Sequence, residues 1–227
     1  KQVSTAEYNP IEAVKTNIDG TTNVINAAID NDVGKTILIS TDKAVHPVNL
    51  YGATKLVAEK VAIQANSYTG RQGTKFSCVR YGNVLGSRGS VVPLFLESRR
   101  DGVIQVTDQR MTRFIMTQEE GVRFVIDCLG RMIGGEVFVP KIPSASIMDI
   151  ATAAAPGTSI EFVGIRLGEK LHEVLITQEE TPHVKEFEGY FIVEPEHVFW
   201  HSESNAASTP VPPDFEYRSD TNAVWLT

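Results

Sequence analysis

The stretch that decides the fold is TILISTDKAVHPVNLYGATK, residues 36–55. Residues 36–40 are short, rich in β-branched side chains and apolar up to the final serine, which predicts a parallel strand buried on both faces. Residues 51–66 carry apolar side chains at helical spacing, so a helix follows this strand after a short loop. Polar residues at the end of such a strand are expected at the edge where open α/β sheets bind their ligands.

The flanking sequence continues the same alternation of helix and strand. Asn9-Pro10 marks the start of a helix that ends near Asn31, and residues 76–81 predict a second buried strand. Helix, strand, helix and strand in this order indicate an α/β domain with a doubly wound parallel sheet, which is a Rossmann-like arrangement. We assign residues 1–84 to the C-terminal half of this sheet domain.

After residue 81 the composition changes to a loop rich in glycine and serine, residues 82–90. Thr117-Gln118-Glu119-Glu120 is a capping-box pattern that opens a helix. The elements predicted beyond the loop are helices at 93–100, 118–131 and 147–155 and strands at 104–107, 112–117, 137–139 and 160–163. We assign residues 85–227 mainly to a smaller α/β lobe, with about 118–140 returning to the sheet domain and an irregular tail at 200–213.

Charge and size narrow the possible functions. With 227 residues and 42% apolar content, the chain can bury one sizeable core or two small ones. Its formal net charge of -7 argues against nucleic acid and anionic membranes as partners, because such partners favour a basic face. An anionic ligand would therefore need a local cluster of arginine and lysine.

The number and spacing of cysteines and histidines argue against two further classes of protein, disulfide scaffolds and metal-binding proteins. Two cysteines argue against a disulfide scaffold, and a reducing cytoplasm is the expected location. No apolar run reaches the roughly 18 residues that suggest a membrane span. The histidines lack metal-ligand spacing, so no metal site is expected at His46, His172, His183, His197 or His201.

Tyr51 and Lys55 are four residues apart on the predicted helix and therefore share one face. A tyrosine with an ordinary pKa of about 10 is a weak base at neutral pH, but a nearby ammonium favours the phenolate and lowers that pKa. This spacing also occurs on helices by chance. The position of the pair directly after a strand ending in Ser40-Thr41 is what favours a catalytic role.

These motifs together resemble those of the extended short-chain dehydrogenase/reductase superfamily. Within it, they resemble the nucleotide-sugar 4,6-dehydratases that act on UDP-N-acetylglucosamine with inversion at C5, in bacterial pseudaminic acid biosynthesis and flagellin glycosylation. The resemblance covers nearly the whole chain and is carried by residues 40–45, 49–55, 80–90, 111–114 and 164–173. A series of motifs in this order is far more specific than any one of them.

The resemblance implies oxidation of the sugar at C4 by a tightly bound NADP, with NAD as the alternative, elimination of water across C5 and C6, and return of the hydride to C6. Tyr51 would take the proton of the C4 hydroxyl, with Lys55 lowering the pKa of that tyrosine and holding the nicotinamide ribose. Thr41 would supply the strand-end hydroxyl. Tyr81 and Asn17 complete the implied cofactor-binding set, with a plain helix-surface residue as the alternative for Asn17.

Asp42 and Lys43 are the residues that this resemblance assigns to the elimination. Lys43 is expected to remove the C5 proton and Asp42 to protonate the departing C6 hydroxyl. Both pKa values would have to move toward neutrality through burial and mutual charge. An isolated Asp-Lys pair is more often a surface ion pair, but the position at a strand end favours the catalytic reading.

The resemblance implies that the Gly/Ser loop, residues 82–90, lies on the UDP-sugar substrate, with a flexible domain connection as the alternative. The resemblance implies that Asn83 reaches the diphosphate and that backbone groups near Ser90 reach the uracil. Arg113 and Arg166 are expected at the diphosphate, because guanidinium groups suit phosphate oxygens. The carboxylates expected at the ribose hydroxyls are Glu169 and Glu173, with a solvated helix residue as the alternative for each.

The family begins with a strand, a Gly-rich turn and a helix N-terminus that bind the cofactor pyrophosphate. No GxGxxG occurs in this chain. By family proportions, about 100 residues, including the first strands of the sheet, are expected ahead of Lys1. We therefore expect the chain as given to bind cofactor weakly or not at all and to lack dehydratase activity, and the full-length protein to form a homo-oligomer.

Two other functions remain open from the sequence. A nucleotide-sugar epimerase or C4 reductase of the same superfamily would share Tyr51 and Lys55 but has no use for Asp42-Lys43. A truncated, non-catalytic binding module would need none of the four side chains.

Overall fold

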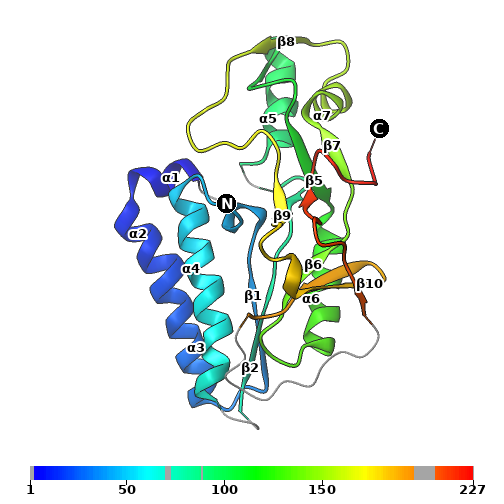
Figure 1. The fold of residues 1–227 in the computed structure, drawn as a ribbon. Coiled ribbons are helices and arrows are strands. Elements are labelled where there is room, and N and C mark those ends of the chain that lie inside the picture. Colours follow the sequence, from blue (N-terminus) through cyan, green and yellow to red (C-terminus); the bar gives the residue numbers. More distant parts are fainter. Residues whose placement is uncertain (1–2, 70–72, 88, 197–207, 227) are drawn as a thin grey trace.

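The computed structural model describes residues 3–69, 73–87, 89–196 and 208–226. The molecule is elongated, with a larger part built around a sheet and a smaller lobe above it (Figure 1). His197, His201 and most of the tail predicted to be irregular lie outside the described residues.

A six-stranded mixed sheet forms the centre of the larger part, in the order β1-β2-β6-β11-β10-β12. The first three strands are parallel, and each later strand is antiparallel to its neighbour. Its members are β1 (Lys35–Ile39), β2 (Lys75–Val79), β6 (Val137–Pro140), β11 (Tyr190–Val193), β10 (Val184–Phe187) and β12 (Thr209–Pro210). The strands predicted at 36–40, 76–81 and 137–139 are confirmed to within two residues, which is the usual uncertainty of element ends.

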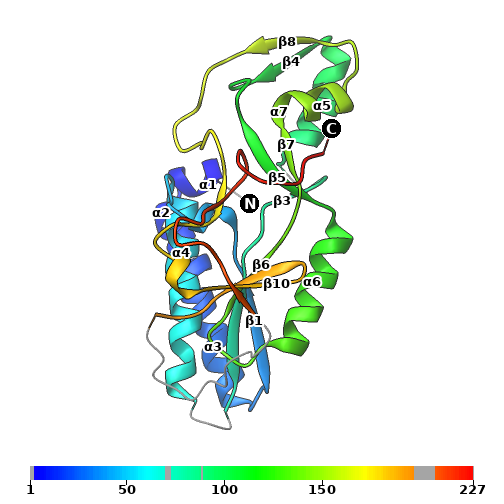
Figure 2. The same cartoon turned by 45° about the vertical axis from the view of Figure 1, so that its right-hand side comes forward.

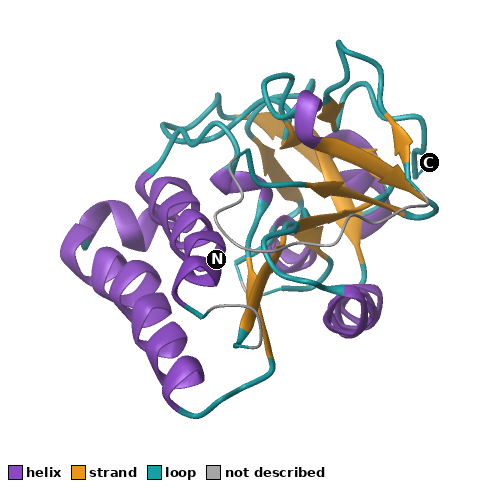
Figure 3. Ribbon diagram, turned by 60° about the horizontal axis from the view of Figure 1, so that its bottom comes forward, coloured by secondary structure: helices purple, strands orange, loops and turns teal. Residues whose placement is uncertain are grey.

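Helices cover both faces of this sheet (Figure 3). Alternate residues of β2 and β6 face opposite sides: Phe76 and Val139 share a core with α3 and α4, whereas Val79 and Phe138 share one with α6. The doubly wound α/β class is therefore confirmed. The helices of this part are α1 (Val3–Tyr8), α2 (Pro10–Val14), the π-helical turn η1 (Lys15–Asp19), α3 (Gly20–Asp30), α4 (Leu50–Gln64), η3 (Ala65–Tyr68) and α6 (Gln118–Arg131).

Local sequence signals account for the helix starts. The Asn49 side chain caps α4 by accepting from the backbone N–H of Gly52 at 2.8 Å. The capping box predicted at the start of α6 is present, with Thr117 Oγ1 and the Glu120 carboxylate each accepting from the other residue's backbone N–H.

The smaller lobe has its own apolar core, which includes Phe95, Ile104 and Ile150. Its strands form two small sheets, β3-β5-β7 and β4-β8. Its elements are β3 (Asn83–Val84), α5 (Val91–Ser98), η4 (Arg99–Asp101), β4 (Val103–Val106), β5 (Thr112–Met116), β7 (Ser144–Ser146), α7 (Ile147–Ala154) and β8 (Ser159–Phe162). Each element predicted in this region is found within two residues of its expected bounds.

Several strands were missed by the sequence analysis. Residues 184–193 form the hairpin of β10 and β11, which turns at Gly189 with φ +81° and joins the larger sheet through β6. Because this pairing partner is distant in sequence, local pattern alone did not place the hairpin. The other missed strands are β3, β7, β9 (Val174–Ile176), β12 and β13 (Tyr217–Arg218), and the short turn η5 (Thr181–His183) was also not predicted.

The C-terminal segment, residues 208–226, runs from the sheet back to the lobe (Figure 2). β12 pairs with β10, β13 pairs with β9, and Trp225 bridges to Ser144 of β7. The segment therefore connects the two parts of the molecule. Within the described residues, no helix combines the length and apolarity needed to cross a membrane.

Candidate active site

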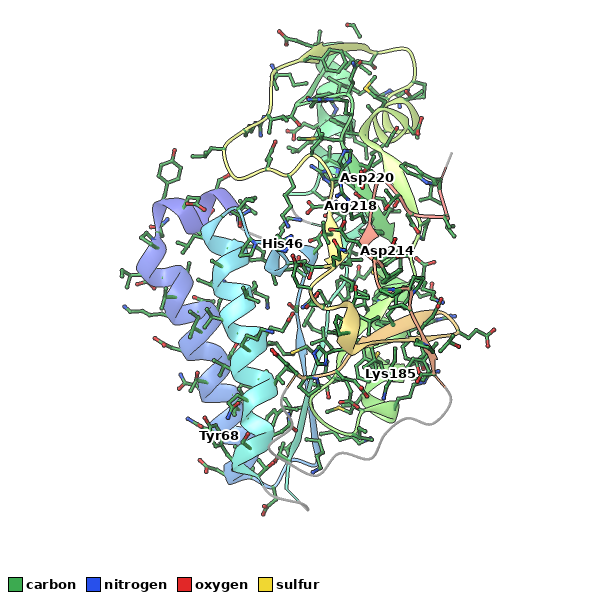
Figure 4. All side chains as sticks on the ribbon, in the orientation of Figure 1. His46, Tyr68, Lys185, Asp214, Arg218 and Asp220 are labelled. Carbon is green, nitrogen blue, oxygen red and sulfur yellow. The ribbon has the colours of Figure 1, made fainter. Side chains whose placement is uncertain are left out.

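The site lies where the carboxyl ends of the parallel strands meet the lobe. Figure 4 labels His46 at the upper end of α4, beside the lobe, and Tyr68 at the lower end of α3 and α4. β1 ends at Ile39 on the His46 side, so the residues that follow it enter this junction. We call residues 41–45 the strand-end turn.

The strand-end turn is a short 3₁₀ turn, η2 (Asp42–Ala44), capped by Thr41. Thr41 Oγ1 accepts from the N–H of Lys43 at 3.4 Å and donates to Asp42 Oδ1 at 2.8 Å. The N–H of Asp42 donates to the carbonyl oxygen of Tyr81 at 3.1 Å, which ties the turn to the end of β2. Asp42 is completely buried and Lys43 is 9% exposed, so the predicted pair is not a surface ion pair.

Two carboxylates surround the ammonium of Lys43. Its Nζ lies 3.0 Å from Asp42 Oδ1 and 3.3 Å from Glu173 Oε1. Burial by itself would lower the pKa of Lys43, but the charges of Asp42 and Glu173 outweigh it and hold that pKa above its ordinary value. The expectation that burial and mutual charge would bring the pKa of Lys43 toward neutrality is therefore wrong, because opposite charges in contact stabilise each other.

Tyr51 and Lys55 both belong to α4, as predicted. Lys55 Nζ donates to the carbonyl oxygen of Ile39 at 2.6 Å and so sits at the end of β1. Burial raises the pKa of Tyr51, with Lys43 opposing that rise, and burial lowers the pKa of Lys55. The prediction that Lys55 lowers the pKa of Tyr51 is contradicted: the cation that acts on the phenol is Lys43.

The other predicted cofactor residues have separate surroundings. Asn17 Nδ2 donates to Thr54 Oγ1 at 2.9 Å, so it braces α4 at the residue before Lys55. Tyr81 follows β2, and burial raises its pKa. Tyr51 and Lys55 share one face of α4, and a phenol and an ammonium are both groups that can hydrogen-bond to hydroxyls.

A cavity of about 510 Å³, which we call the lobe cavity, opens beside the strand-end turn. Lys43 lines it. So do all six residues predicted to bind the UDP-sugar: Asn83, Ser90, Arg113, Arg166, Glu169 and Glu173. The structure therefore brings together residues that are spread over more than half of the chain.

The two arginines of the lobe cavity differ in burial and in hydrogen bonding. The side chain of Arg113 is 13% exposed, and its guanidinium donates to the carbonyl oxygens of Thr112 at 2.7 Å and of Lys170 and Leu171 at 3.1 Å. Arg166 is exposed at the cavity wall. Contact of either arginine with a diphosphate stays a prediction.

Lys170 is a site residue that the sequence analysis missed. It lines the lobe cavity, and its Nζ donates to the carbonyl oxygens of Asp42, at 3.3 Å, and of Val45. It therefore fastens both ends of the strand-end turn. Its place between Glu169 and Leu171 in the quoted motif was visible in the sequence, but no local signal indicated that it reaches back to residue 42.

A second cavity of about 540 Å³, the sheet cavity, lies beside α6. Tyr81 and Ile39 line it, and it shares Val84 and Leu85 with the lobe cavity. Among the predicted residues, Asn17, Tyr51, Lys55 and the pair Thr41-Asp42 line neither cavity, although Tyr51 lies near enough to Asp42, Lys43 and Tyr81 for their charges to act on it.

Comparison with known proteins identifies a family to which the sequence is similar. Residues 1–195 match the family described as polysaccharide biosynthesis protein. The chain is 47% identical to the UDP-N-acetylglucosamine 4,6-dehydratase (inverting) of Campylobacter jejuni, over all of this chain and 71% of that protein. It is 41% identical to the UDP-glucose 4-epimerase of Rickettsia felis, over 84% of this chain and 58% of that protein.

Among solved structures, the X-ray structure of Pen from Bacillus thuringiensis superposes with a TM-score of 0.89 at 39% identity. The match covers 99% of this chain and 69% of that one. The arrangement of sheet, lobe and C-terminal segment is therefore found in a solved relative.

Proposed function

The chain belongs to the polysaccharide biosynthesis protein family, and we propose that it is a nucleotide-sugar 4,6-dehydratase. The reaction would convert UDP-N-acetylglucosamine to a UDP-2-acetamido-2,6-dideoxy-4-keto hexose with inversion at C5. The observation that carries this proposal is the buried contact of Asp42 with Lys43 at the strand end, near Tyr51 and beside the lobe cavity. The name of the Campylobacter jejuni relative supports the same reaction.

Tyr51 and Lys55 would serve the oxidation at C4. A nicotinamide cofactor would supply the hydride acceptor for C4 and later the hydride donor for C6. Tyr51 would accept the proton of the C4 hydroxyl, which requires the phenolate that burial disfavours and Lys43 favours. Lys55, held at the carbonyl oxygen of Ile39, would bind the nicotinamide ribose beside that tyrosine.

Asp42 and Lys43 would serve the elimination. Transfer of one proton over the 3.0 Å from Lys43 Nζ to Asp42 Oδ1 leaves an amine and a carboxylic acid side by side. The amine removes the C5 proton, the C5–C6 double bond forms, and the C6–O bond breaks as Asp42 protonates the departing hydroxyl to give water. This step regenerates the ammonium and carboxylate of the resting pair.

The lobe cavity would hold the UDP portion of the substrate. Asn83, Arg113 and Arg166 line it and offer donors for a diphosphate, and Ser90 has a buried hydroxyl for which the described residues provide no partner. Arg113 and Arg166 would supply the local positive charge that a chain of net charge -7 needs for an anionic ligand. Glu169 remains the candidate for the ribose hydroxyls.

The proposal extends to a cytoplasmic, homo-oligomeric enzyme that uses NADP, with NAD as the alternative, and acts in pseudaminic acid biosynthesis. We also propose that the sheet domain ends at residue 84 and that residues 118–140 return to it. The pairing of β6 with β2 supports this return of residues 118–140.

Proton NMR of the reaction mixture tests the proposed function. An enzyme containing this chain, incubated with UDP-N-acetylglucosamine and NADP or NAD, should give a new C6 methyl signal and a 4-keto sugar whose coupling constants report the C5 configuration. An unchanged substrate spectrum with both cofactors would contradict the proposal.

A nucleotide-sugar epimerase is the second candidate, because the Rickettsia felis relative carries that name. Asp42→Asn separates the two. A dehydratase variant should oxidise C4 and stall before losing water, whereas an epimerase should keep turning over. Asp30→Asn, which changes an exposed carboxylate at the end of α3, is the matched control.

A further inference from the structure

Glu173 lines the lobe cavity and lies against two cations, and its contact with the ribose hydroxyls stays a prediction. It is 3% exposed, and its Oε1 lies 3.3 Å from Lys43 Nζ and 3.7 Å from Arg113 Nε. Its other oxygen, Oε2, is buried without a hydrogen-bond partner among the described residues. A carboxylate buried in this way is stabilised chiefly by the two cations on Oε1.

The backbone of Glu173 is fixed independently of these charges. Its N–H donates to Ser219 Oγ at 2.9 Å, and its carbonyl oxygen accepts from the N–H of Ser219 at 2.9 Å. Glu173 and Lys43 are 130 residues apart in sequence. The bonds to Ser219, which belongs to the C-terminal segment, hold the backbone of Glu173 where its carboxylate reaches the strand-end turn. The contact is therefore a feature of the tertiary structure and not of a local turn.

We propose that Glu173 is a positioning residue for the elimination step, which holds Lys43 Nζ against Asp42 and opposes transfer of a proton from Lys43 to Asp42. The inference rests on the proposed dehydratase function. Proton transfer to Asp42 makes Lys43 the base at C5, and a second carboxylate on the same Nζ opposes that transfer. Glu173 thereby keeps the pair in its charged form until substrate enters the lobe cavity that Lys43 and Glu173 both line.

The titratable groups near Lys43 come from η2, β5, α4 and the loop that holds Lys170 and Glu173, and the proposal requires the effect of Glu173 to be measured apart from the others. Asp42 of η2 and Glu173 raise its pKa, whereas Arg113 of β5 lowers it. Lys170 faces the same pair, and Tyr51 of α4 lies within reach of the Lys43 charge. Removing Glu173 alone leaves Asp42 in contact, so its contribution can be measured by itself.

Carbon-13 NMR of the 227-residue chain with labelled lysine Cε measures this contribution. Lys43→Arg identifies the resonance. In Glu173→Gln the titration midpoint of Lys43 should fall by at least about one pH unit relative to the unsubstituted chain, because an opposite charge in contact shifts a pKa by about 1–3 units. Glu179→Gln removes an equal charge from an exposed side chain that contacts His46, and it should leave the midpoint unchanged.

An unchanged Lys43 midpoint in folded Glu173→Gln overturns the proposal. If that variant does not fold, Glu173→Asp decides in its place, because the shorter side chain withdraws the carboxylate from Nζ and should also lower the midpoint. Turnover of UDP-N-acetylglucosamine separates the two inferences. If the unsubstituted enzyme forms no product, the proposed function is contradicted. If the unsubstituted enzyme and Glu173→Gln both form product and their kcat values have the same pH profile, only the role of Glu173 is contradicted.

Discussion

Glu59→Gln tests the buried ionic network beneath the strand-end turn. We call Ser40, Glu59, Arg80 and Glu180 the Arg80 network. The Arg80 guanidinium, in a residue 2% exposed, lies 2.6 Å from Glu59 Oε1 through Nη2 and 3.3 Å from Oε2 through Nε. It also contacts both carboxylate oxygens of Glu180, at 2.9 and 3.0 Å, and Ser40 Oγ donates to Glu59 Oε2 at 2.7 Å.

The expected loss of stability follows from this arrangement. Removing one partner of a buried pair costs about 3–5 kcal/mol, because the other charge stays buried and unpaired. Glu180 remains on Arg80, and glutamine keeps one acceptor oxygen, so we expect the lower end of that range, about 3 kcal/mol. For a chain of this size, 1 kcal/mol corresponds to roughly 2–4 °C in Tm, so Tm should fall by about 6–12 °C.

Thermal unfolding followed by circular dichroism measures the change. Glu119→Gln is the matched control, because Glu119 pairs with Arg123 on the surface of α6 with both side chains about three-quarters exposed. Exposed pairs of this kind contribute little, so the control should unfold within about 2 °C of the unsubstituted chain. A similarly small change in Glu59→Gln would refute the reasoning.

The effect of Glu59→Gln should also depend on pH. Burial would raise the pKa of Glu59, but Arg80 and Ser40 override it and hold that pKa below its ordinary value. A depressed carboxyl pKa stabilises the folded state above the unfolded pKa, about 4.3 for glutamate, and this stabilisation disappears as pH falls through the folded value. The Tm difference should therefore be full at neutral pH and shrink in acid below about pH 4.

Three further predictions concern the proposed site. Tyr51→Phe should abolish the transient reduction of bound nicotinamide cofactor, followed at 340 nm in a single turnover, while UDP affinity by calorimetry stays the same; retained transient reduction would exclude Tyr51 as the C4 base. Arg113→Ala should weaken UDP binding at least about tenfold, since a charge-assisted pair contributes about 1.5–3 kcal/mol, whereas Arg110→Ala, which loses only the exposed pair with Asp108, should not. Gly52→Ala would place a Cβ 2.1 Å from the carbonyl oxygen of Lys43. The strand-end turn must then move, so both Tm and dehydration should fall, and wild-type values for both would show that the turn tolerates displacement.

Local order along the chain determined much of the fold and part of the site. A continuous apolar run predicts β1, and a capping box predicts the start of α6, because both depend only on neighbouring residues. Tyr51 and Lys55 share a face of α4 for the same reason, since helical spacing alone brings them together. The six residues predicted to bind the UDP-sugar also line one cavity, and their contact with the substrate stays a prediction.

Only the tertiary structure decided which charged groups surround Asp42 and Lys43 in the strand-end turn. Lys170 and Glu173 reach Asp42 and Lys43 across 128 and 130 residues, and the C-terminal segment holds Glu173 in place. Sequence reasoning gave the side chains but not the partners, so it predicted the wrong direction for the pKa values of Lys43 and Tyr51. The physical reason is that a pKa depends on burial and on charges within a few ångströms, whatever their separation along the chain.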